Sequence, residues 1–150
     1  MLPNESPRPR RRPGWRAPVK SALRWLMAAF YVWAGINHFL RPDFYLRLMP
    51  PYIPLHSELV AITGVIEIAL GVLVAIPRTA SLAAWGIILM LIAFLPVHVH
   101  MLVNNQLYPE APTSVLWLRF PIQALFILWA YWYTGRRPAR AAEPTTAIAA

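Results

Sequence analysis

Four long apolar stretches constrain this chain more than any other feature. They cover residues 21–40, 58–76, 80–101 and 115–133, and each holds few charged side chains. A helix rises about 1.5 Å per residue and a hydrocarbon core is about 30 Å thick, so each stretch is long enough to cross a membrane once. Hydrophobic residues make up 58% of the chain and charged residues 13%, a balance that excludes an ordinary soluble domain. The sequence predicts an all-α, integral membrane four-helix bundle.

The segments outside these spans have a different composition. Residues 1–20 form a basic arm whose prolines interrupt any helix, so we expect a disordered strap that binds the anionic headgroups of membrane lipids. The transmembrane domain then covers 21–134, and the Ala- and Thr-rich tail 135–150 is also predicted to be disordered. Within the domain, the proline- and aromatic-rich segment 41–57 is expected to be a loop at the membrane interface.

The first span resembles a signal peptide because a basic arm precedes it. Its bulky aromatic residues and the lack of a small-x-small cleavage site instead favour a retained anchor. The aromatic residues in question are Trp25, Phe30, Tyr31 and Trp33.

Basic residues lie mostly on one side of the predicted spans. The arm and the start of the first span, the turn at Arg78 and the C-terminal tail hold eleven of the fourteen Lys and Arg residues. Because positive charge stays on the cytoplasmic side, both termini are predicted to be cytoplasmic, in a multi-pass protein of the bacterial cytoplasmic (inner) membrane. Nucleic-acid binding is not expected, since these charges flank apolar spans. With no cysteine in the sequence, any redox role needs a bound cofactor.

Glu67 is the most informative residue. It lies nine positions after Glu58, about 13 Å along the second span and near the middle of the membrane. A carboxylate at that depth must pair, face water or take up a proton. Gly64 and Gly71 share its helical face and allow another helix to approach closely. Glu67 is therefore predicted to face the bundle interior.

Arg119, about one turn into the fourth span, is the predicted counter-charge for Glu67. Gln123 lies one turn further on the same face, while Tyr31 and His38 share a face of the first helix. A Glu67–Arg119 pair that only holds two helices in register is an equally weighted alternative, and His38 at a helix end is also explained by bonding to headgroups or backbone.

The histidines do not predict a metal site. His98 and His100 are two residues apart and diverge by about 200° on a helix, so they converge only if Pro96 unwinds the helix end.

Several short motifs resemble those of the DoxX family of small four-helix bacterial membrane proteins. The similarity covers about residues 22–134 and lies in the segments Gly35–Phe39, Met49–Pro54, Thr63–Glu67 and Arg119–Gln123. The segment Pro96–His100 departs from the family pattern. The resemblance implies a four-helix fold and, through the oxidoreductase subunit after which the family is named, a link to quinones. The candidate ligand-binding residues are therefore Glu67, Arg119, His38, Gln123, Tyr31 and Thr63.

Three functions follow from these residues. The first is an accessory subunit of a quinone-linked membrane redox system, in which the polar cluster binds a quinone head and an oxidoreductase is the partner subunit. The second is a small proton-linked transporter, which would require a homo-oligomer because four spans are few for such a machine. The third is a non-catalytic membrane scaffold. No motif decides whether the protein is an enzyme.

Overall fold

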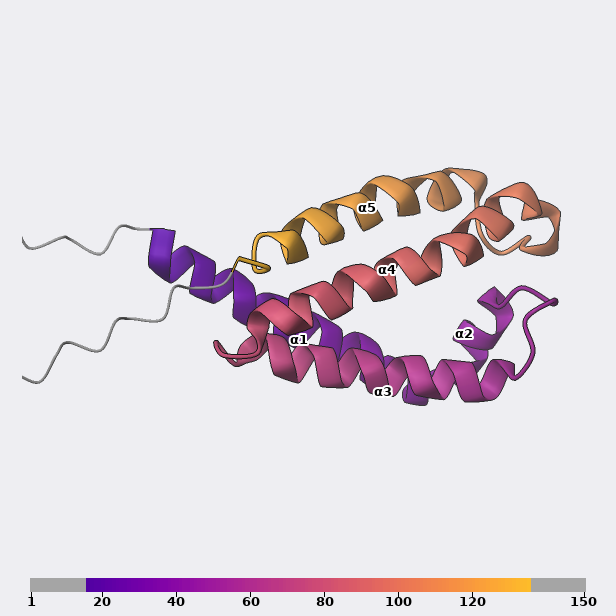
Figure 1. Ribbon diagram of the computed structural model, residues 1–150. Helices are drawn as coiled ribbons and strands as arrows, with labels where there is room; N and C mark the ends of the chain where they lie inside the picture. Colours follow the sequence, from indigo (N-terminus) through magenta and orange to yellow (C-terminus); the bar gives the residue numbers. More distant parts are fainter. Residues whose placement is uncertain (1–15, 136–150) are drawn as a thin grey trace, which may run out of the picture.

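A computed structural model describes residues 16–135, and that range holds five α-helices, one short 3₁₀ helix and no strand (Figure 1). Three of the helices, α3, α4 and α5, are long and apolar enough to cross a membrane. Over the described residues the fold is therefore all-helical, with the long apolar helices of a membrane protein. The predictions for residues 1–15 and 136–150 lie outside the described residues. The elements are α1 (Arg16–Leu40), α2 (Pro42–Leu48), α3 (His56–Ala75), α4 (Ala80–Val103), η1 (Asn105–Leu107) and α5 (Thr113–Tyr131).

The helix bounds correct two predictions. α1 begins at Arg16, so residues 16–20 are helical and not part of a disordered arm. Pro18 is tolerated there because the first turn of a helix does not use its backbone N–H groups. The segment 41–57 is not loop throughout, since it contains α2. Pro42 starts this helix and Asp43 lies in its first turn, which are both favoured at a helix N-terminus.

α1 and α3 pack antiparallel through small residues. A Cβ atom added to Gly35 of α1 would lie 2.5 Å from the carbonyl oxygen of Gly64 on α3, and one added to Gly71 would lie 2.8 Å from the backbone nitrogen of Val32. Backbones can approach this closely only where side chains are absent. This glycine-lined contact is the most extensive one between any two of the described helices.

α4 and α5 form the second antiparallel pair. The buried Gln123 of α5 donates a hydrogen bond to the carbonyl oxygen of Leu91 on α4. The main core cluster, which includes Met27, Val74 and Ile87, lies where α1, α3 and α4 meet. α3 contacts α4 and α4 contacts α5, so the helices follow one another around the bundle in chain order from α3 onward.

The two ends of the bundle differ. At one end, Lys20 Nζ donates to the carbonyl oxygen of Trp132 at 2.9 Å, and the Tyr133 hydroxyl donates to the carbonyl oxygen of Lys20 at 2.9 Å. These bonds join α1 to the end of α5, and we call this end the terminal end. The opposite end, with α2 and η1, is the loop end. α1 and α5 diverge toward the loop end (Figure 1).

The outer surface of the helices is largely apolar. Large side chains such as Trp25, Leu82 and Leu89 point away from the core, and Leu82 is 73% exposed. An apolar surface of this extent is unfavourable in water and suits contact with lipid tails. The polar groups described next are therefore the exceptions inside an apolar body.

Candidate functional site

Glu67 lies on the buried face of α3. The buried residues of this helix recur at intervals of three and four, as a single face requires: Val60, Gly64, Glu67, Gly71 and Val74. Only 6% of the Glu67 surface is exposed. The prediction that this carboxyl faces the bundle interior is confirmed, and the glycines on either side of it make the contact with α1.

His38 of α1 is the ionisable neighbour of Glu67. Its Nε2 atom lies 3.6 Å from Glu67 Oε2, and both side chains are buried. That separation is short enough for an ion pair but longer than a hydrogen bond. Tyr31, Gly35 and His38 form the buried face of α1, as their spacing predicted. Gly35 of α1 and Gly64 of α3 face each other and let the two helices approach closely, which brings the side chains of His38 and Glu67 together.

The other nitrogen of His38 fixes where its proton lies. His38 Nδ1 is 2.9 Å from the carbonyl oxygen of Val60, and a carbonyl can only accept a hydrogen bond. Nδ1 therefore carries a hydrogen, and in the neutral ring Nε2 offers a lone pair to Glu67. One further proton then makes the pair neutral, either on the carboxyl of Glu67 or on Nε2 of His38. Without that proton, the site would hold an uncompensated buried charge.

Two more predicted residues border this pair. The Thr63 hydroxyl lies 3.3 Å from His38 Nδ1 and donates to the carbonyl oxygen of Leu59 at 2.8 Å. Tyr31 is buried on the same face of α1 as His38, and its hydroxyl has no hydrogen-bond partner among the described residues. Glu67 Oε2 also lacks a hydrogen-bond partner within that range. The site thus keeps two buried polar atoms without hydrogen bonds, whereas most buried polar groups are bonded.

Arg119 does not pair with Glu67, so that prediction is wrong. The ion pairs found among residues 16–135 are His38 with Glu67 and Arg47 with Glu110. Arg119 instead donates to Met101 Sδ at 3.6 Å. Arg119 does not reach Glu67 because α1 covers the buried face of α3, whereas α5, which carries Arg119, packs on α4.

Gln123 is also separate from the Glu67 site, because its amide bonds to the backbone of Leu91 on α4. Of the six residues predicted from the sequence, the structure gathers Glu67, His38, Thr63 and Tyr31 and leaves out Arg119 and Gln123.

Tyr45 and Asn37 also belong to the site, although they were not predicted from the sequence. The ring of Tyr45, on α2, stacks on that of His38 with centroids 3.7 Å apart, and Asn37 Nδ2 donates to the Tyr45 hydroxyl at 3.2 Å. Burial raises the pKa of Tyr45, the Asn37 hydrogen bond opposes that shift, and the charge of Glu67 adds to it. The helix-start signal of Pro42 followed by Asp43 would have found α2, and with it Tyr45.

The arrangement suits proton binding better than metal binding. In the part of the chain that the structure describes, no three His, Cys, Asp or Glu side chains come together as metal ligands. The His38–Glu67 pair instead offers two atoms, Nε2 and Oε2, that compete for one proton inside an apolar body. A group that donates to Oε2, or accepts from the Tyr31 hydroxyl, would complete the hydrogen bonding of the site.

The fold and this site define a helical membrane protein with a buried histidine–carboxyl pair. Residues 27–134 match the family described as "Domain of unknown function (DUF8561)", and the chain belongs to that family. No curated protein and no solved structure matches the chain. The resemblance to the DoxX family stays a prediction.

Proposed function

We propose that this protein handles a proton inside the membrane, at the His38–Glu67 pair, as an accessory subunit of a quinone-linked redox system. The observation that carries the proposal is the hydrogen bond from His38 Nδ1 to the Val60 carbonyl oxygen. It leaves His38 Nε2 and Glu67 Oε2, which lie 3.6 Å apart, to share a single proton. A carboxyl poised this way can release and regain a proton within a low-dielectric interior.

The topology that we propose is four crossings with both termini in the cytoplasm of a bacterium. α1 completes the bundle because it lies along α3 from Gly71 to Gly64, and a helix that packs over that length of a spanning helix occupies the same depth. The hydrogen bonds between Lys20, Trp132 and Tyr133 join the beginning of α1 to the end of α5, which supports an even number of crossings. The positive charge of both flanking segments favours the cytoplasmic side, with the basic arm on anionic lipids.

A quinone is the ligand that fits the unused polar atoms. Its carbonyl oxygens accept hydrogen bonds, and the Tyr31 hydroxyl and a protonated Glu67 are donors without partners among residues 16–135. Reduction of a quinone to a quinol takes up two electrons and two protons. The electrons would come from an oxidoreductase partner, and the pair would supply protons one at a time. The aromatic rings of Phe30 and Phe126, stacked at 4.8 Å beside Tyr31, would flank such a head group.

The test is the Glu67→Gln variant, compared with wild type in a strain that lacks the native gene. We expect purified wild-type protein to retain quinone and Glu67→Gln to lose most of it, with a matching fall in quinone-linked respiration. The matched control is Glu58→Gln, which removes the same charge from an exposed position of the same helix. Quinone retention and respiration that are the same in both variants would overturn the proposal.

The protonation state has its own measurement. In the infrared spectrum, we expect the carbonyl band of a protonated carboxyl that disappears in Glu67→Gln and shifts in His38→Gln. A spectrum unchanged by Glu67→Gln would show that this carboxyl does not hold the proton.

A second candidate is proton-linked transport by a homo-oligomer, which the same shared proton favours. In proteoliposomes under a pH gradient, it predicts proton flux that Glu67→Gln abolishes and Glu58→Gln preserves. Quinone retention without flux supports the redox function, and flux without quinone supports transport. If neither appears, the pair serves only to hold α1 against α3 in a membrane scaffold.

A further inference from the structure

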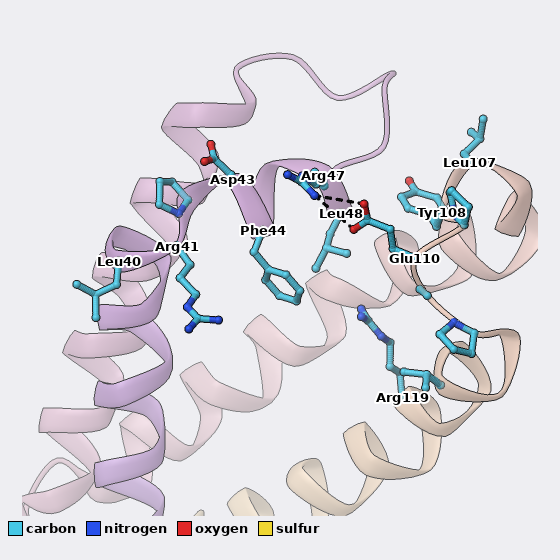
Figure 2. Close-up of a pocket in the computed structure, with 15 residues that line it drawn as sticks. Leu40, Arg41, Asp43, Phe44, Arg47, Leu48, Leu107, Tyr108, Glu110 and Arg119 are labelled. Carbon is cyan, nitrogen blue, oxygen red and sulfur yellow. Dashed lines mark hydrogen bonds and ion pairs between the residues drawn. The ribbon is translucent and has the colours of Figure 1, made fainter.

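A pocket of about 770 Å³ lies at the loop end, and neither His38 nor Glu67 lines it. Its walls come from the last turn of α1, from α2, from the loop between η1 and α5, and from the first turns of α5 (Figure 2). It occupies the region where α1 and α5 have diverged, so it lies between helices that meet at the terminal end. The pocket therefore results from the divergence of α1 and α5 toward the loop end.

Three arginines and two acidic residues line this pocket, but their charges do not cancel locally. Arg47 pairs with Glu110 at 3.3 Å on the exposed rim. Neither Arg41 nor Arg119 forms an ion pair within the described residues. The remaining acid, Asp43, also lines the pocket and forms no ion pair within the described residues, so three arginines against two acids leave one net positive charge.

Two guanidinium groups are therefore left to act on the pocket. Those of Arg41 and Arg119 extend into it from opposite walls (Figure 2). Arg119 donates to the sulfur of Met101, which is a weak acceptor. An anion with several acceptor oxygens would bind both groups far better, because guanidinium forms paired, charge-assisted hydrogen bonds with phosphate oxygens.

The other walls are apolar. Leu40, Phe44 and Val115 line the pocket and are each more than a third exposed, so the pocket continues into the lipid-facing surface of α1 and α5. Arg119 lies six residues after the first residue of α5, which is about 9 Å along the helix, within reach of the headgroup region for a long basic side chain. A ligand that fills this space needs an anionic head and apolar tails.

We propose that this pocket binds an anionic phospholipid, whose phosphate is held between Arg41 and Arg119 and whose acyl chains lie along α1 and α5. The net positive charge of the pocket favours a headgroup such as phosphatidylglycerol over one that carries its own cation, such as phosphatidylcholine. The proposal does not depend on the proton function of His38 and Glu67. It also differs from lipid binding by the basic arm, because the pocket lies at the other end of the helices.

The experiment is native mass spectrometry of the full chain in detergent, titrated with phosphatidylglycerol or phosphatidylcholine. High salt is included because it screens exposed charges of the arm more than charges inside a pocket. For wild type, we expect one phosphatidylglycerol that survives high salt, and weaker retention of phosphatidylcholine. For the double variant Arg41→Gln with Arg119→Gln, we expect binding at that site to weaken at least about tenfold. The lipid phosphate would lose its charged hydrogen bonds to both guanidinium groups.

The matched control is Arg78→Gln, which removes an exposed arginine from the turn between α3 and α4 and should leave the site intact. Val115→Trp fills the pocket while both arginines remain, so it tests the site if the double variant folds poorly. Equal retention of the two lipids by wild type, or undiminished phosphatidylglycerol in the double variant and in Val115→Trp, would overturn the proposal. Displacement of the lipid by inorganic phosphate alone would show that the site recognises a free anion instead.

Discussion

The α1–α3 contact and the α4–α5 contact solve the same packing problem in different ways. α1 and α3 meet through glycines, so their backbones are in contact. The buried His38–Glu67 pair lies within that contact. α4 and α5 meet through larger side chains and through hydrogen bonds from Gln123 to Leu91 and from Arg119 to Met101. The histidine and the carboxyl are thus enclosed where α1 and α3 are in close contact. The arginines line a pocket where α1 and α5 separate.

This difference shows what small residues accomplish in a membrane. Lipid tails are as apolar as leucine, so helices gain little from burying leucine against one another. Close backbone packing and polar contacts supply the attraction instead. In α1 and α3 these two contributions occur together, because Gly64 touches His38 Cβ while Glu67 lies one turn further along α3.

The largest predicted effect comes from disrupting the glycine contact. In Gly35→Ala, the new methyl group would lie 2.5 Å from the backbone carbonyl oxygen of Gly64, so one helix must move. We expect a loss of about 1–3 kcal/mol in the free energy of unfolding, measured by denaturant titration in mixed micelles. Gly86→Ala is the control, because its new methyl group meets only the end of the Leu70 side chain, which can rotate away. Equal losses in both variants would contradict the proposed role of the α1–α3 contact.

The next prediction concerns which residue is the partner of Glu67. His38→Leu leaves the carboxyl without its neighbour and should cost about 1–3 kcal/mol of unfolding free energy. The double variant His38→Leu with Glu67→Leu should be more stable than the sum of the two single changes implies, since no lone buried charge remains. Combining Arg119→Leu with Glu67→Leu should give additive losses, because those residues do not touch. Coupling between Glu67 and Arg119 would reverse this assignment.

The smallest predicted effect is a pH dependence at Tyr45. Burial raises the pKa of this phenol in the folded protein above its usual value of about 10, so the unfolded chain loses the proton first. Its contribution to stability is present below pH of about 10 and is lost as the pH rises through the folded pKa. We expect the melting temperature to fall less steeply in this alkaline range for Tyr45→Phe than for wild type. A Tyr45→Phe curve that coincides with that of wild type in this range would contradict the prediction.

The sequence by itself determined the four long helices and the directions in which the buried faces of α1 and α3 point. Apolar length placed the four long helices within about five residues of their observed bounds, and the intervals between Gly64, Glu67 and Gly71 placed the carboxyl on the buried face. These properties are local, because the 3.6-residue repeat of a helix follows from the chain alone. The same rule correctly put Tyr31 and His38 on one face of α1.

Only the tertiary structure decided which helices are neighbours. Arg119 was predicted to pair with Glu67 because it is the one charged residue of the fourth span and enters the membrane from the side opposite the termini. Depth and charge do not say which helix covers which face, and α1 covers that of α3. His38 gained its role through this contact, and Tyr45 through a short helix that folds back onto it. Such choices depend on packing between distant segments, which helical periodicity does not encode.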